Sequence, residues 1–163
     1  MIKEGVPPIL NKSVRVLILG SLPSDESIRQ EEYYAKPSND FWKLISKTIG
    51  EDITGLEYED KLSKLQENGI GLWDVFHRAS REGSLDSKIK QPEMNDFSGL
   101  RDIAPSLKLI CFNGKKAREH EDVFHNKGFK TKVLLSSSGA NRSNSAKRDM
   151  QWESLLSYME SLE

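Results

Sequence analysis

Short apolar runs alternate along the chain with segments whose apolar residues recur every three or four positions. The run at residues 14–19 is rich in branched apolar residues and predicts a buried strand. Three further apolar runs, at residues 70–75, 108–112 and 132–135, predict three more strands. The polar stretch at residues 78–92 predicts a loop. We therefore expect strands that are separated in sequence by helices.

Apolar residues at helical spacing predict helices at residues 40–50, 58–68 and 145–162. The first of these carries one apolar face, formed by Phe41, Trp42, Leu44, Ile45 and Ile49. The apolar side of the last is formed by Met150, Trp152, Leu155, Leu156, Met159 and Leu162. Residues 96–103 and 114–125 also favour helix, and Gly69 is placed to cap the end of the second helix.

This alternation predicts a single α/β domain over residues 1–163, with a mostly parallel sheet covered on both faces. In such sheets, ligands bind outside the carboxyl ends of the strands. Three loops rich in small and polar residues follow strands directly, at residues 20–24, 113–114 and 136–142. We expect these loops to converge on a functional site.

Composition narrows the class of protein. Hydrophobic residues make up 36% and charged residues 30% of the chain, which is typical of a soluble globular domain. No apolar run approaches the ~18–20 residues that a membrane span needs, and residues 1–8 contain no apolar signal-peptide core. We expect an intracellular, cytoplasmic protein that does not bind membranes.

The cysteine and the histidines of the sequence do not match a metal-binding motif. The single cysteine, Cys111, lies in an apolar run and predicts a buried thiol, not a disulfide framework or a cluster of thiolate ligands. The spacing of His77, His120 and His125 matches no metal motif. We expect no metal and no cofactor.

Charge is unevenly distributed although the net charge is only −1. Residues 113–148 carry nine Lys/Arg and three Asp/Glu, a balance of +6 that leaves −7 for the rest of the chain. Such a region is compatible with contact to phosphates. The alternative is an ordinary solvated face.

Six sequence motifs, in order, resemble the uracil-DNA glycosylase superfamily, and its hypoxanthine-DNA glycosylase branch more than its mismatch-specific uracil/thymine branch. They are GSLPS at 20–24, YYAKPSNDFW at 33–42, GLWDV at 71–75, REGSLD at 81–86, FNGKKA at 112–117 and SSGANR at 137–142. The resemblance runs from about residue 14 to the end of the chain. It implies a three-layer α/β/α fold with a central four-stranded parallel sheet.

The same resemblance implies a monofunctional glycosylase that acts in base excision repair as a monomer on DNA. Such an enzyme flips a deaminated base, hypoxanthine or uracil, out of the duplex and hydrolyses its N-glycosidic bond without a metal or cofactor. Asn39 resembles the catalytic residue, because its amide can orient a water or bind the base edge. The alternative is that Asn39 caps the helix that begins beside it.

The base-binding residues that the resemblance implies are Ser21, Leu22, Tyr34 and Asn113. Leu22 stands where the mismatch-specific branch has a water-positioning asparagine, so only the backbone N–H groups of Ser21 and Leu22 could bind a base carbonyl. Tyr34 would stack on the flipped base, although ordinary packing is the alternative for both Tyr33 and Tyr34. Asn113 would bind the Watson–Crick edge, and a helix cap is its alternative.

The loop after the last strand resembles the segment that enters DNA. Its members are Ser136, Ser137, Ser138, Gly139, Ala140, Asn141 and Arg142. Gly139 would allow close backbone approach, and the serines and Arg142 would contact phosphates. Ala140 is small for a residue that fills the space left by the base. Lys36 and Ser38 also depart from the His and Arg more usual in the branch.

Two alternatives stay open. One is a glycosylase of the same superfamily directed at uracil or mismatches. The other is a non-catalytic α/β module that binds nucleic acid or a nucleotide, including a glycosylase relative inactivated by Leu22. A dinucleotide site is disfavoured, since the first strand ends in GSLPS and not in G-x-G-x-x-G.

Overall fold

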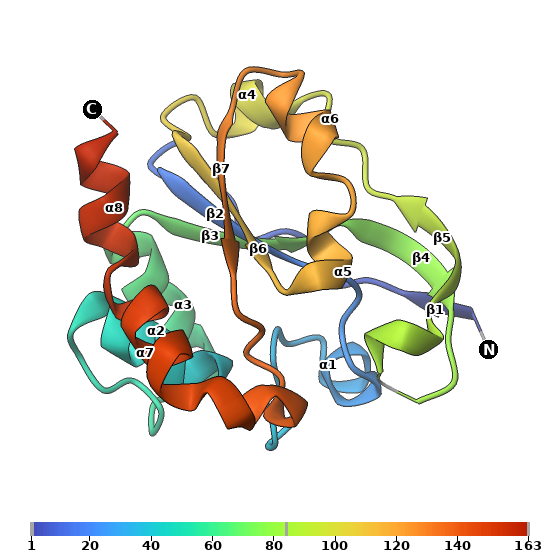
Figure 1. Ribbon diagram of the computed structural model, residues 1–163. Helices are drawn as coiled ribbons and strands as arrows, with labels where there is room; N and C mark the ends of the chain where they lie inside the picture. The colour runs from blue at the N-terminus through green and yellow to red at the C-terminus, as the bar shows by residue number, and fades with distance from the viewer. Residues whose placement is uncertain (1, 84, 163) are drawn as a thin grey trace.

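Four parallel strands form the central sheet of the computed structural model, which describes residues 2–83 and 85–162 (Figure 1). In spatial order they are β3 (Ile70–Asp74), β2 (Val16–Gly20), β6 (Leu109–Asn113) and β7 (Lys130–Leu134). In register, Val16 lies opposite Ile70 on one side and Leu109 on the other. The parallel sheet and its four strands are as predicted.

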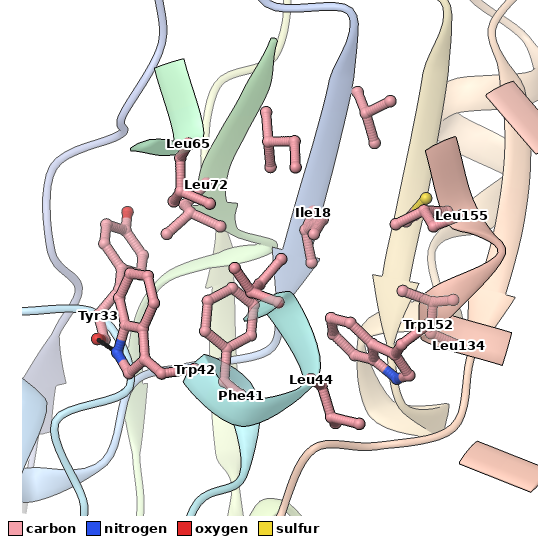
Figure 2. Packing of buried hydrophobic residues seen from close by; sticks show 14 of the residues in the cluster. Ile18, Tyr33, Phe41, Trp42, Leu44, Leu65, Leu72, Leu134, Trp152 and Leu155 are labelled. Atoms are coloured by element: carbon pink, nitrogen blue, oxygen red, sulfur yellow. Dashed lines mark hydrogen bonds between the residues drawn. The ribbon is translucent and has the colours of Figure 1, made fainter. Parts of the chain in front are cut away.

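One face of the sheet is covered by four helices (Figure 1). They are α2 (Phe41–Ile49), α3 (Tyr58–Glu67), α7 (Ser145–Glu153) and α8 (Leu155–Ser161). Figure 2 shows Phe41, Trp42 and Trp152 packed beneath the strand residues Ile18 and Leu134. The Phe41 ring meets Trp42 and Trp152 edge-on, with centroids 5.0 and 5.8 Å apart. These contacts fix the start of α2, which adjoins the segment carrying Asn39.

Three short helices cover the opposite face. They are α4 (Leu100–Ile103), α5 (Lys115–Arg118) and α6 (Glu121–His125). Leu17, Leu19 and Phe112 point to this side and pack with Phe97 and Phe124. Because neighbouring residues of a strand face opposite ways, the continuous apolar runs of β2 and β6 feed both cores. The result is the expected three-layer α/β/α arrangement.

A second, antiparallel sheet extends the molecule beyond this side, in the order β1-β4-β5 (Figure 1). Its strands are β1 (Ile2–Glu4), β4 (Phe76–Ser80) and β5 (Lys90–Met94), with a 3-10 turn at Asp86–Lys88. The prediction of a loop at residues 78–92 is therefore wrong at both ends, where β4 and β5 lie, and is confirmed only between those two strands. Four of the five residues of β5 are exposed, so pairing of the backbone, and not a hydrophobic face, defines this strand.

Helix ends also differ from the sequence prediction. A helix α1 (Asp25–Gln30) follows the loop at 20–24, and the Ser24 hydroxyl caps it by accepting a hydrogen bond from the Ser27 N–H at 3.2 Å. The long helix expected at 145–162 is broken at Ser154, and Met150 is 71% exposed instead of lying on its apolar side. The stretch at 114–125 divides into α5 and α6, and that at 96–103 shortens to α4.

Gly69 follows α3 with a φ of 70° and donates its N–H to the Gln66 carbonyl, as expected of a residue that caps a helix end. Among the described residues, no helix combines the length and the apolar character that crossing a membrane would require.

Candidate active site

The ends of three neighbouring strands form the centre of the site. Gly20, at the end of β2, lies opposite Asp74 at the end of β3. On its other side, Asn113 follows Phe112, the partner of Leu19. All three residues belong to the face of the sheet that α2 covers, since they alternate with residues of the opposite core. The predicted convergence of the strand-end loops is thus present, with Asp74 as a member that the sequence analysis missed.

Asn113 is 7% exposed, and both ends of its amide are hydrogen-bonded. Its Nδ2 donates to the Ser137 hydroxyl at 2.9 Å and to the Tyr34 hydroxyl at 3.2 Å. Its Oδ1 accepts from the Ser137 N–H at 2.9 Å. The helix-cap alternative for Asn113 is wrong, because Gly114 is the capping residue of α5. Asn113 instead joins β6 to the loop that follows β7.

Tyr34 lies over Gly20 in a left-handed backbone conformation, with φ of 56°. Its ring stacks on Phe41, with centroids 3.8 Å apart and an interplanar angle of 11°. Its hydroxyl would lie only 3.1 Å from a Cβ at Gly20. Burial, with the nearby Asp74 charge, raises the pKa of Tyr34 far above its usual range, so the hydroxyl stays neutral. Stacking on Phe41 occupies one face of the half-buried ring.

Tyr33 has a different role from its neighbour. It is 2% exposed, and its hydroxyl donates to the carbonyls of Val6 and Pro7. Its own carbonyl accepts from the indole nitrogen of Trp42 at 3.3 Å, as the dashed line in Figure 2 shows. The packing alternative therefore describes Tyr33 fully.

Asn39 lies one residue before Asp40, the N-cap residue of α2, and its side chain caps the first backbone N–H of that helix. Its Oδ1 accepts from the Phe41 N–H at 2.9 Å, in the first turn of α2. Its own N–H donates to the Lys36 carbonyl at 2.9 Å. Within residues 2–83 and 85–162, its Nδ2 makes no hydrogen bond. The cap fixes the side-chain orientation and leaves the amide nitrogen available to a ligand.

The loop at residues 20–24 is held from beneath by Arg81, which is 2% exposed. The guanidinium donates to the carbonyls of Leu22 and Pro23, and its Nε donates to Gly83. The Ser21 hydroxyl donates to Asp86 Oδ1 at 2.6 Å. The Leu22 side chain is buried in the apolar core, so only the backbone of Leu22 can contribute to a base site. The sequence pointed to this support only through the motif at 81–86.

A buried ionic cluster joins α2 to the loop at 136–142. Asp40 accepts from Arg142 through both carboxylate oxygens at 2.9 Å and from Arg148 at 2.8 Å. These two guanidinium groups lower the pKa of Asp40 to about 2. Arg148, which is 3% exposed, also donates to the carbonyls of Ser136 and Ser138. Neither Asp40 nor Arg148 was predicted as a site residue, because 108 positions separate them.

The remaining loop residues divide into inward and outward groups. Ser137 is 1% exposed and its polar atoms bond to Asn113, so it faces inward and away from any phosphate. The hydroxyl of Ser138 accepts from the Ala140 N–H, at the start of the 3-10 turn Gly139–Asn144. A Cβ at Gly139 would lie 2.3 Å from the Ser38 carbonyl oxygen, so the loop needs glycine there.

Ala140 and Arg142 are exposed and Ser136 is half-buried. The Asn141 side chain, also predicted to bind DNA, lies outside the described residues.

Basic residues lie at both edges of the sheet. A surface hollow beside the loop at 136–142 is lined by the basic residues Lys43, Lys47, Arg142 and Arg148 and by the acids Asp40 and Asp149. Lys130, in contrast, begins β7, and the loop follows the other end of that strand. A five-residue strand spans roughly 16 Å, so Lys130 lies well apart from the basic residues of that loop.

No group of three or more His, Cys, Asp or Glu side chains in the described part of the chain is placed to hold a metal ion.

Comparisons with known proteins agree with this architecture. Residues 7–160 match the family model described as the uracil DNA glycosylase superfamily. A protein of Methanosarcina acetivorans named hypoxanthine DNA glycosylase is 56% identical over 156 residues, covering 96% of this chain and 99% of its own. A protein of the same name from Methanosarcina barkeri is 51% identical over 152 residues, which cover 93% of this chain and 96% of that protein.

A solved structure has the same fold. The solution NMR structure of a candidate uracil DNA glycosylase from Methanosarcina acetivorans superposes with a TM-score of 0.90 at 55% identity. The similarity covers 98% of this chain and 99% of that one.

Proposed function

Because this chain belongs to the uracil DNA glycosylase superfamily, we propose that it is a DNA-repair glycosylase that releases a deaminated base, with hypoxanthine as the first substrate to test. The observation that carries this proposal is its 56% identity, over nearly the whole length of both chains, to a protein named hypoxanthine DNA glycosylase. The polar groups gathered at the carboxyl edge of the sheet supply a site of the required chemistry.

Hydrolysis of an N-glycosidic bond leaves positive charge on the sugar and negative charge on the departing base. We assign to Asn39 the placement of the attacking water or the support of the base, because its Nδ2 is available while its Oδ1 is fixed by the Phe41 N–H. The backbone at Ser21 and Leu22, held by Arg81, offers N–H groups to a base carbonyl. The apolar side chain of Leu22 cannot hydrogen-bond a water, so we assign the positioning of water to Asn39.

Tyr34 and Asn113 form the walls of the proposed base site. The face of the Tyr34 ring away from Phe41 can stack on any base. Asn113 is held in one orientation by Ser137, which presets its amide for a base edge once the Tyr34 hydroxyl is displaced. A preset polar group avoids the cost of reorganisation during the reaction.

DNA would approach along the loop at 136–142 and the hollow beside it. Exposed Ala140 at the loop tip offers little bulk to replace an extruded base, whereas Arg142 is 54% exposed and large enough to do so. Lys43 and Lys47 add positive charge on α2. Contacts of this kind position the duplex without reading its sequence.

We further propose that the chain is a single domain over residues 1–163 and works inside the cell as a monomer. The proposed chemistry draws on no metal or cofactor. Sedimentation of the protein alone and with a DNA duplex tests the monomer, and activity in the presence of a chelator tests the independence from metal.

The experiment that tests the function is a panel of duplexes containing hypoxanthine, uracil or xanthine at one position. We expect release of hypoxanthine and an abasic site that breaks only after treatment with alkali. Preference for uracil would favour the uracil-directed alternative. Binding to the damaged duplex without release of any base would favour the non-catalytic module and overturn the proposal.

A further inference from the structure

Asp74 is a buried acid with an unpaired carboxylate oxygen. It is 4% exposed, and its Oδ2 has no hydrogen-bond partner in the described part of the chain. Arg81 is the cation whose charge acts on it, but the Arg81 guanidinium is directed at the backbone carbonyls of Leu22, Pro23 and Gly83. Buried polar atoms are nearly always paired, so an unpaired carboxylate oxygen requires an explanation.

The carboxyl group leans over Gly20, in the centre of the site. A Cβ at Gly20 would lie 2.7 Å from Asp74 Oδ1 and 3.1 Å from the Tyr34 hydroxyl. Glycine therefore allows the acid and the Tyr34 hydroxyl, which accepts a hydrogen bond from Asn113, to approach the end of β2 closely. Tyr34 and Asn113 are the walls of the proposed base site, so Asp74 lies at that site.

The surroundings of Asp74 favour its neutral form. Burial and, to a smaller extent, the charge of Asp86 raise the pKa of Asp74 to about 7, although the charge of Arg81 lowers it. Tyr33 and Tyr34 also face it, and both keep neutral hydroxyls because burial raises their pKa. A neutral carboxyl presents an O–H donor beside a carbonyl acceptor, whereas a carboxylate only accepts.

We propose that Asp74, in its protonated form, binds the lactam edge of the flipped base, the ring N–H beside a C=O. Hypoxanthine and uracil both present such an edge, and deamination is the reaction that creates the carbonyl in each. Two hydrogen bonds then form: Asp74 donates to the base carbonyl and accepts from the ring N–H. An ionised Asp74 loses the donor and repels the carbonyl oxygen. The Tyr34 hydroxyl leaves its place above Gly20 as the base enters.

This inference rests on the proposed function, and the rate of base release as a function of pH tests it. Single-turnover release of hypoxanthine from a duplex should fall up to about tenfold per pH unit above the pKa of about 7. Asp74→Asn keeps a donor and an acceptor but does not ionise, so its rate should stay level across this range. Asp74→Leu removes both hydrogen bonds and should lower the rate by about 10²–10³ at pH 6.

Asp52→Asn is the matched control. Asp52 is an exposed acid bonded only to Thr54 in the described part of the chain, so this variant should keep the wild-type profile. A wild-type rate that stays level or rises up to about pH 9 would overturn the role of Asp74, whether or not any variant folds. So would an Asp74→Asn enzyme that retains the wild-type fall.

Failure of the proposed function gives a different result. If the wild type releases no base at any pH, the glycosylase proposal fails, and the Asp74 site is then tested by binding of free hypoxanthine, followed by NMR at about pH 6 and pH 8. Binding that is at least several-fold weaker at the higher pH in the wild type, and equal at both in Asp74→Asn, supports the site. Binding that does not change with pH, or no binding, overturns it.

Discussion

The Arg148 guanidinium and the Asp40 carboxylate form a buried ion pair, 2.8 Å apart, between the helix that begins beside Asn39 and the loop proposed to enter DNA. The Asp40 N–H also donates to the Ser137 carbonyl at 2.8 Å. Through these contacts the candidate catalytic residue and the loop proposed to enter DNA are positioned against each other. The pair therefore affects both stability and the geometry of the site.

Replacing Arg148 with Met should destabilise the protein by about 1–3 kcal/mol, because it removes a buried hydrogen-bond partner of Asp40, although Asp40 keeps Arg142. The change also leaves the Ser136 and Ser138 carbonyls without a donor that they now have. Denaturant unfolding measures the loss. Arg142→Ala is the control, since Arg142 is half-exposed and its removal should cost no more than about 1 kcal/mol. Equal losses in the two variants would contradict this account.

Asn39→Ala should slow base release by about 10²–10³ if the amide acts in the reaction. It should also lower stability by about 0.5–2 kcal/mol, because the cap on the Phe41 N–H is lost. The rate and the unfolding free energy are measured on the same preparation.

Asn39→Asp separates the two roles, since it keeps the capping oxygen and loses the Nδ2 donor. It should retain most of the stability and lose most of the rate. An Asn39→Asp enzyme with normal rate would reduce Asn39 to a helix cap and make Asn113 the next candidate.

Binding to duplex DNA should weaken steeply as salt rises, despite the net charge of −1, because contacts with phosphates release counterions. Lys43→Ala, in the hollow beside the loop, should weaken binding to all sequences and reduce the slope of log K against log salt by about 1. Lys130→Ala, at the opposite edge of the sheet, should leave that slope unchanged. A flat salt dependence of the wild type would be evidence against the basic hollow as a DNA site.

Tyr34→Leu should weaken binding of the damaged duplex roughly 5–150-fold, because it removes a stacking interaction of about 1–3 kcal/mol. Tyr34→Phe keeps the ring, and Asn113 Nδ2 then retains Ser137 as its acceptor. Half-saturating enzyme concentrations in single-turnover assays distinguish the two variants. If Leu and Phe give the same value, the ring does not stack on the base.

The sequence predicted those parts of the fold whose signal is burial. Residues 16–19 are apolar without interruption because β2 has a core on both of its faces. The strands β4 and β5 were missed because polar residues predominate from 78 to 92. These strands are held by backbone hydrogen bonds, which require no particular pattern of side chains in the sequence. Met150 was predicted to lie on the apolar side of one continuous helix. The chain instead forms two helices, and α7, which contains Met150, ends at Glu153.

The candidate site was predicted where strand order alone determines proximity, as for Asn113 and the loop after β7. It was not predicted where the determining fact is the contact of distant side chains. Asp74 ends an apolar strand and is inconspicuous in sequence; only the folded molecule shows that one of its carboxylate oxygens lacks a partner among the described residues. Likewise, the sequence contained both Asp40 and Arg148 without indicating that they meet.

The lone thiol on β6 gives the molecule an internal reporter of its own opening. Cys111 is fully buried between β2 and β7, and burial raises the pKa of its thiol far above the usual range. A thiol reagent can therefore modify Cys111 only when the sheet separates. Because the chain contains a single cysteine, all labelling reports on this position. Because Cys111 lies two residues before Asn113, the labelling rate follows the opening of the strand that ends at the proposed base site. Saturation with a duplex that binds this site should slow labelling in proportion to its occupancy.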